Sequence, residues 1–195
     1  MHFITLMLPR LIIALSILFT PLYSQDVVVD KVKFNSLSRS WVEVEIELTC
    51  NGNTSGDSVS GDFLEKIKVK PYLAFSKDSG TNQFIYFTSE IEILIMERRD
   101  SNKVYFYLPG LIIERDDLKL PDYYYVELEV NGNPVAPQKS AYDGIGAGSI
   151  ENFKSQVQAG AEKTKDMLMP VYLAPLEFSS RVQRELPTLL RREAK

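Results

Sequence analysis

The stretch from Trp41 to Cys50 alternates strictly between apolar and polar side chains. It reads Trp-Val-Glu-Val-Glu-Ile-Glu-Leu-Thr-Cys, so the apolar residues from Val42 to Cys50 share one face and three glutamates lie on the other. Successive side chains of a strand point to opposite faces, and a period of two therefore predicts a strand with one buried and one solvated face. Because most of the region from Asp26 to Val135 repeats this pattern, the sequence predicts an antiparallel β domain.

Polar turns divide this region into about seven strand-like runs. The run Tyr123–Val130 is the clearest of the others, and the Asn131-Gly132 pair that follows it is a strong signal for a β-hairpin. Pro71 cannot donate to a ladder, so we expect its strand to be bulged there or to lie at a sheet edge. This pattern favours a mainly β fold, an immunoglobulin-like antiparallel β-sandwich, with a small barrel as the alternative. The runs expected to form strands are 26–34, 41–50, 63–75, 84–96, 103–109, 123–130 and 134–136.

The chain begins with a segment typical of export signals. Arg10 precedes the apolar run Leu11–Phe19, Pro21 breaks any helix, and the small residue Ser24 suits cleavage before Gln25. The run is shorter than the roughly 20 apolar residues that span a bilayer, and it has the length of a signal peptide's central region. We therefore expect an exported bacterial protein, in the periplasm or at the cell surface, with no transmembrane span in the mature chain. An uncleaved N-terminal anchor is the alternative.

The expected mature region is acidic and poor in reactive side chains. Positions 25–150 carry 13 basic and 20 acidic residues, a balance of −7, whereas positions 151–195 carry 8 basic and 6 acidic residues, a balance of +2. An acidic body without basic clusters lacks the electrostatic footprint of a nucleic-acid binder. Cys50 is the only cysteine, so an intramolecular disulfide is excluded. His2, the only histidine, lies in the predicted signal peptide, which excludes histidine-dependent nucleophiles and metal sites from the mature chain.

Three further patterns are weaker candidates for chemistry. The Asp116-Asp117 pair offers oxygen ligands for calcium, but it lacks EF-hand spacing, and a charged loop paired with Arg115 is the simpler interpretation. The glycines between Gly144 and Gly148 lack the spacing of a dinucleotide-binding fingerprint and are interpreted as a hinge. The rows of glutamates are expected to form solvated faces. We therefore predict no catalytic residue, no cofactor and no metal, and hence a protein that is not an enzyme.

After Ala136 the spacing of apolar residues changes from two to three and four. The glycine-rich stretch 138–149 is typical of a flexible linker. An amphipathic helix is expected from Ile150, with Ser149 as its N-cap, and a second short helix from about 179 to 192. The predicted domains are a signal peptide at 1–24, a β-sandwich at 25–137, the linker at 138–149 and an amphipathic helical tail at 150–195.

Tyrosines lie opposite the aliphatic residues of two predicted strands. If these strands are neighbours, the tyrosines form an aromatic platform, which suits a protein interface or the stacking of a sugar. The third possibility is that the C-terminal helices cover this face. The residues predicted to contact a partner protein are Tyr105, Tyr107, Tyr123, Tyr125, Phe153, Val157, Leu186 and Leu190.

The stretch from Trp41, together with the runs Ile67–Phe75, Tyr105–Gly110 and Tyr123–Gly132, resembles small exported β-sandwich proteins encoded beside type IV pilus-like assembly genes in some bacteria. The resemblance covers about 26–135 and rests on structural motifs. It implies an immunoglobulin-like fold, a role in pilus or envelope assembly and no catalytic residues, and it does not place the segment after Gly144. We therefore expect a non-enzymatic interaction protein with a protein partner in the cell envelope. The alternative is a carbohydrate-binding β-sandwich module that uses the tyrosine platform.

Overall fold

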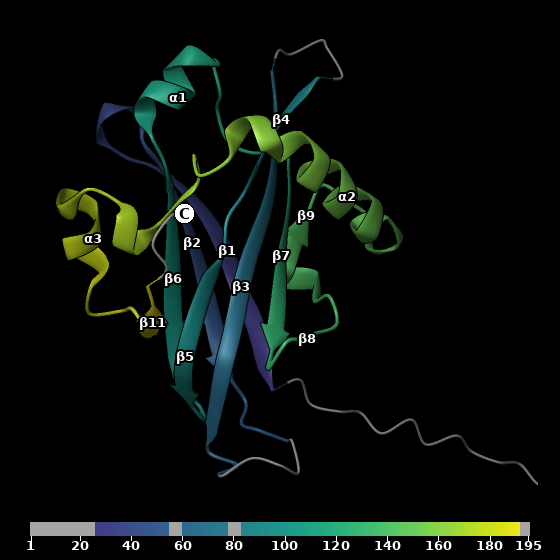
Figure 1. The fold of residues 1–195 in the computed structure, drawn as a ribbon, viewed down its shortest axis with the longest axis vertical. Helices are drawn as coiled ribbons and strands as arrows, with labels where there is room; N and C mark the ends of the chain where they lie inside the picture. The colour runs from purple at the N-terminus through teal and green to yellow at the C-terminus, as the bar shows by residue number, and fades with distance from the viewer. Residues whose placement is uncertain (1–25, 55–59, 78–82, 192–195) are drawn as a thin grey trace, which may run out of the picture.

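The computed structural model describes residues 26–54, 60–77 and 83–191, and the predicted signal peptide lies outside this range. Two antiparallel sheets pack face to face (Figure 1). The prediction of an antiparallel β-sandwich is therefore confirmed. Sheet A contains, in spatial order, β1 (Val27–Ser36), β2 (Val42–Cys50), β6 (Ser101–Leu108) and β10 (Met169–Pro170).

Sheet B is the larger sheet and includes the last strand of the described chain. In spatial order it contains β11 (Thr188–Leu190), β5 (Ile91–Glu97), β3 (Phe63–Ser76), β7 (Tyr123–Val130) and β8 (Asn133–Pro134), while β4 (Phe84–Thr88) pairs with β3 and β9 (Tyr142–Asp143) pairs with β7. The ladders β1-β2-β6 and β3-β7-β8 reproduce the A-B-E and C-F-G pairings of immunoglobulin domains, but β5 joins β3, whereas strand D of those domains joins E.

Helices and 3₁₀ turns connect the strands and cover the sheets. The α-helices are α1 (Gly110–Arg115), α2 (Ile150–Gly160) and α3 (Leu176–Val182). Among the described residues, none of these helices has the length and hydropathy needed to cross a bilayer. The 3₁₀ turns are η1 (Ser38–Ser40), η2 (Lys139–Ala141), η3 (Ala147–Ser149), η4 (Ala161–Thr164) and η5 (Val171–Leu173).

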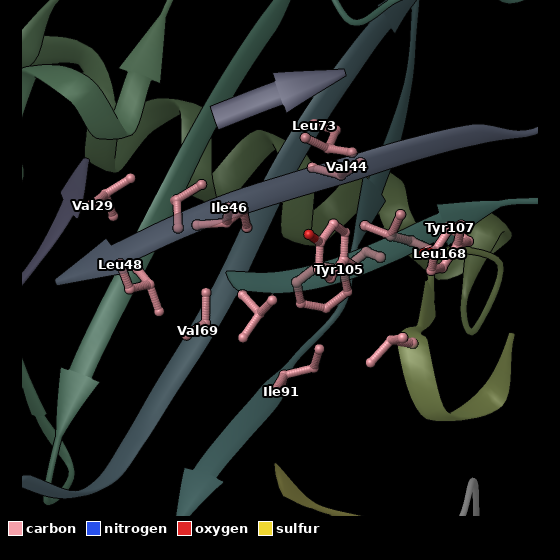
Figure 2. Close-up of a cluster of buried hydrophobic side chains, with 14 of the residues drawn as sticks. Val29, Val44, Ile46, Leu48, Val69, Leu73, Ile91, Tyr105, Tyr107 and Leu168 are labelled. Carbon is pink, nitrogen blue, oxygen red and sulfur yellow. The ribbon is translucent and has the colours of Figure 1, made fainter. Parts of the chain in front are cut away.

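The core lies between the sheets and is built from the apolar faces that the alternation predicts. Val44, Ile46 and Leu48 of β2 are fully buried, and Figure 2 shows Val44 beside Leu73 and Leu48 near Val69, both of β3. Leu168, which follows η4, belongs to the same cluster. The C-terminal region therefore contributes to the main core and is not an appendage to it.

The expectation that Pro71 marks an edge strand is wrong, because β3 is a central strand with β7 on one side and β5 and β4 on the other. The β3–β5 ladder ends at Val69 and the β3–β4 ladder begins at Tyr72, so the missing N–H of Pro71 faces a break between two strands. The Thr88 hydroxyl donates to the Pro71 carbonyl across this break, at 2.9 Å. The alternative of a bulge at Pro71 is wrong as well, because the β3–β7 pairing runs from Ile67 to Ala74 without a shift in register.

The stretch 138–149, predicted as a flexible linker, is instead fixed to the sandwich. The Gln138 side chain accepts from the backbone N–H of Val29 at 2.5 Å and donates to the carbonyl of Val27, and β9 pairs with β7. Gly144 has a φ of +74°, and a Cβ there would lie 2.5 Å from the carbonyl oxygen of Asp122. This glycine therefore permits a close approach to the sheet and does not act as a hinge.

The C-terminal helices are shorter than predicted. The helix expected from Ile150 is α2, which ends at Gly160 and tightens into η4. The second helix ends at Val182, and Pro187 is followed by the strand β11, which pairs with β5. Because proline lacks an N–H and distorts a helix interior, the chain leaves the helix before this residue.

Candidate interaction surfaces

The segment from Ile150 to Arg191, here called the C-terminal segment, crosses both outer faces of the sandwich. It begins with α2 on sheet B, pairs β10 with the edge of β6, packs α3 on sheet A and ends with β11 on the edge of β5. Figure 1 shows α2 and α3 on opposite sides of the molecule. Both sheets are therefore covered on their outer faces, at least in part.

On sheet A, α3 covers an aromatic and acidic cluster. The ring of Phe178 lies 4.9 Å from Trp41 and stacks on Tyr107 at 5.8 Å, measured between ring centroids. The Tyr107 hydroxyl donates to Glu43 at 2.9 Å, and the Tyr105 hydroxyl donates to Glu185 at 2.7 Å. Burial, reinforced by these hydrogen bonds to carboxylates, raises the pKa of both tyrosines well above the ordinary range.

Two lysines neutralise the same cluster. Lys33 and Lys103 lie 2.7 Å and 3.4 Å from Glu45, and Lys103 also lies 2.9 Å from Glu185. Hydrogen bonds from Lys103 and Tyr105 lower the pKa of Glu185, and the bond to Glu185 raises the pKa of Lys103. These contacts join the loop before β11 to sheet A.

The expectation that the glutamates of β2 are solvated is wrong for two of them, since Glu43 is 5% and Glu45 is 9% exposed. Their partners come from β1, from β6 and, through Lys103, from the loop before β11. Across the described part of the chain, every buried side-chain nitrogen or oxygen has a hydrogen-bond partner. The cluster is thus a closed network that holds the fold together.

On sheet B, α2 covers a similar network. The Tyr72 hydroxyl donates to Glu127 at 2.7 Å, Lys154 of α2 pairs with the other oxygen of Glu127, and Gln158 donates to the Tyr72 hydroxyl at 3.4 Å. The rings of Tyr72 and Tyr125 stack at 6.0 Å. Burial lowers the pKa of Lys154, but the hydrogen bonds and charges of Glu127 and Glu151 together outweigh burial and leave the pKa raised.

The predicted tyrosine platform does not form. Strands β6 and β7 belong to different sheets, so the tyrosines of one lie on the opposite outer face from those of the other. Coverage by the C-terminal helices, the third possibility, is what the structure has: Phe153 and Val157 are buried against Tyr125, while Leu186 and Leu190 are partly exposed. Three of the four tyrosines are at most 2% exposed, namely Tyr105, Tyr107 and Tyr125.

The Asp116 region is a charged loop, as the simpler interpretation had it. Asp116 accepts two hydrogen bonds from Arg115, at 2.9 and 2.6 Å, and these bonds lower the pKa of Asp116. Among residues 26–54, 60–77 and 83–191, no group of three or more acidic, cysteine or histidine side chains is arranged to hold a metal ion.

The most exposed large apolar side chains of the described residues lie on the short helices α1 and α3, and the sequence did not predict them as contact residues. Leu111 is 80% exposed and Leu176 is 79% exposed. The two helices meet at Arg39, whose backbone abuts Gly110 and whose guanidinium lies 3.7 Å from Glu177. In the sequence, each of these leucines lies in the first turn of a helix that follows a proline. The apolar periodicity does not assign this position to the buried or to the exposed face.

A groove of about 480 Å³ runs along α3 from Leu176. Its apolar lining includes Leu186, which the sequence predicted to contact a partner, and Leu189. Ser179 and Gln183 supply polar groups along the same groove. We call this surface, together with Leu111, the leucine surface.

A second, smaller cavity of about 190 Å³ lies between α2 and sheet B, here called the aromatic pocket. It brings together Tyr123 and Phe153, two further residues that the sequence predicted to contact a partner. Phe84 of β4 lies 5.4 Å from Tyr123 and 6.2 Å from Tyr86, between ring centroids, so three rings from the sheet meet one from the helix.

Comparison with known proteins supports the fold. No protein-family model matches this chain, and no curated protein matches it. A crystal structure of a protein from Akkermansia muciniphila is similar to it, with a TM-score of 0.64 and 16% sequence identity, over 87% of this chain and 95% of that one. The likeness covers 87% of this chain, whereas the region 26–135 is little more than half of it. The likeness therefore extends beyond this region and includes part of the C-terminal segment. At this identity the likeness concerns the fold alone.

Proposed function

We propose that this protein is a non-enzymatic component of an exported, envelope- or pilus-associated assembly and that it binds a partner protein through the leucine surface. The observation that carries the proposal is the exposure of Leu111 and Leu176, each about four-fifths open to solvent. Leu176 lines a groove that has both apolar and polar walls, and large apolar side chains exposed beside such a groove are typical of protein–protein interfaces. The expected export signal and the resemblance to pilus-associated proteins support the envelope as the place of this contact.

The chemistry of the groove suits an apolar anchor from a partner. Leu176, Leu186 and Leu189 supply apolar walls. The Gln183 amide can pair with the partner's backbone, and the Ser179 hydroxyl, which donates to the Pro175 carbonyl at 3.5 Å, can accept from it. Interfaces of this kind gain most of their affinity from a few buried anchors surrounded by polar groups that exclude water. A partner segment with one or two large apolar side chains therefore fits this surface.

The proposal is tested by crosslinked pull-down from native cell envelopes. The test variant is Leu111→Asp with Leu176→Asp, because both positions are exposed and lie in the first turn of a helix, where an acidic side chain is tolerated. The matched control is Phe63→Asp, a 41% exposed aromatic residue at the start of β3 that does not line the groove. We expect the wild type and the control to recover the same assembly proteins and the double variant to lose them. Equal recovery by all three would overturn the proposal.

The alternative of a carbohydrate module was expected to use the tyrosine platform, which includes Tyr105 and Tyr107. Because both rings are buried beneath the C-terminal segment, replacing them by alanine would damage the fold as well as any binding. A role in sugar recognition therefore needs a different aromatic site.

A further inference from the structure

The aromatic pocket has the size of a site for a single ring. Its volume of about 190 Å³ is smaller than the roughly 300–1,000 Å³ of pockets that hold drug-sized ligands. Phe84, Tyr86 and Tyr123 form the wall on the sheet side, and Phe153 faces them from α2. Gly160 allows this arrangement, because a Cβ there would lie 2.3 Å from the Tyr86 ring.

One helix face gives this apolar pocket a polar rim. Ser149, Asn152 and Gln156 all line it, and they are spaced by three and four residues, which places them in a row on one side of α2. All three are exposed, so their polar groups are accessible from solvent. Among the described residues that line the pocket none is charged.

This combination selects among ligands. A charged ligand would lose hydration on entering an aromatic site that offers no opposite charge, which is unfavourable. A purely apolar ring, such as a phenylalanine side chain of a partner, would cover the two amides and the hydroxyl without pairing them. A neutral sugar ring satisfies both parts of the site, because it has an apolar face of C–H groups for the rings and a circumference of hydroxyls for the amides.

We propose that the aromatic pocket binds one neutral sugar ring, which packs against Tyr123 and Phe84, whose rings are inclined by 63°, and hydrogen-bonds to Asn152 and Gln156. Amides both donate and accept, as hydroxyls do, so each of the two side chains can pair with neighbouring hydroxyls of one ring. The site is separate from the leucine surface and does not depend on the function proposed for that surface.

The experiment is a titration of the isotopically labelled protein, without its predicted signal peptide, followed by backbone amide NMR. The probes are methyl glycosides of glucose, galactose and N-acetylglucosamine, with a methyl glucuronide as the charged probe and N-acetylphenylalanine amide as the apolar-ring probe. We expect at least one neutral glycoside to bind with a Kd of about 1 mM, as weak one-ring ligands do, and to shift amides of α2 and β4. The glucuronide and the phenylalanine amide should bind more weakly.

The test variant is Asn152→Ala with Gln156→Ala, and the matched control is Ser155→Ala on the same helix outside the pocket. All three positions are exposed and alanine favours helix, so the variants should stay folded. The double variant is expected to bind the glycoside at least about tenfold more weakly, because it loses two or more hydrogen bonds, whereas the control binds as the wild type does. The proposal is overturned if no neutral glycoside shifts the pocket amides, if the phenylalanine amide binds more tightly than every glycoside, or if the double variant binds unchanged.

Discussion

Phe178 is the residue on which the docking of α3 depends most directly, and its replacement by alanine gives a sharp test. The side chain is 3% exposed and its ring packs between Trp41 and Tyr107. Truncation of a buried phenylalanine costs about 3–5 kcal/mol, of which the two ring contacts account for about 0.5–1.5 kcal/mol each. Because a short helix near the chain end can open locally, we expect a value near the lower limit, about 3 kcal/mol.

The assay uses the only tryptophan of the chain as a reporter. Trp41 touches Phe178, so its fluorescence follows the docking of α3, while circular dichroism follows the sheets during urea unfolding. For Phe178→Ala we expect the fluorescence transition to move to lower urea, ahead of the sheet transition. The control Leu176→Ala, on the same helix but 79% exposed, should stay within about 0.5 kcal/mol of the wild type. If both variants unfold as the wild type does, α3 does not depend on Phe178 and the reasoning fails.

Three other predictions concern the C-terminal segment and its connection to the sandwich. Because hydrogen bonds from Lys103 and the neighbouring tyrosine lower the pKa of Glu185, the stability they confer is present above about pH 4.3 and is lost as the pH falls through the lowered value. The protection of β11 amides, measured as the intrinsic exchange rate at each pH divided by the observed rate, should therefore fall on acidification in the wild type but not in Glu185→Gln. Gly144→Ala should lower the free energy of unfolding by about 2 kcal/mol, because φ is +74° and the new Cβ would lie 2.5 Å from a carbonyl oxygen, whereas Gly146→Ala, which meets nothing within 4 Å, should be neutral in urea titrations. A chain ending at Gly148 should fail to unfold cooperatively in calorimetry, since it exposes both covered faces; a transition at the wild-type temperature would refute this.

The strands of the sandwich could be predicted because their signal is local. β7 (Tyr123–Val130) has the bounds that alternation indicates, and the Asn131-Gly132 turn follows it with φ values of 51° and 80°, the left-handed conformation that these residue types favour. β2 begins one residue after the expected position. Alternation and turn chemistry depend on neighbours in the sequence, so a single chain is enough to detect them.

The pairing of distant strands had no such signal. Pro71 suggested an edge strand, yet β3 is central, because a break between β5 and β4 occurs opposite the proline. The run 84–96 contains this break at Ser89 and Glu90, which the apolar pattern does not mark. Which strand lies beside β3 is decided by packing between residues far apart in the chain, and that information is absent from local periodicity.

The candidate sites show the same division between local and long-range information. A period of two separates the two faces of a strand, but it does not tell whether the second face meets water or another layer. The tyrosines of β6 and β7 carried the relevant signal, since rings placed opposite an aliphatic face indicate that both faces are partly buried. The amphipathic pattern from Ile150 predicted α2, the helix that covers the outer face of sheet B.

Taken together, these two signals indicate that the predicted boundary before Ile150 does not separate two independent domains. The apolar stripe of α2 has its partners on sheet B, and Phe178 of α3 has its partners on sheet A, so the sandwich and the C-terminal segment bury each other. An amphipathic tail beside a sheet with aromatic residues on its outer face is therefore best interpreted as one cooperative unit. The leucines of α1 and α3 and the pocket between α2 and β4 are among the surfaces that neither layer covers, and our two proposals concern these surfaces.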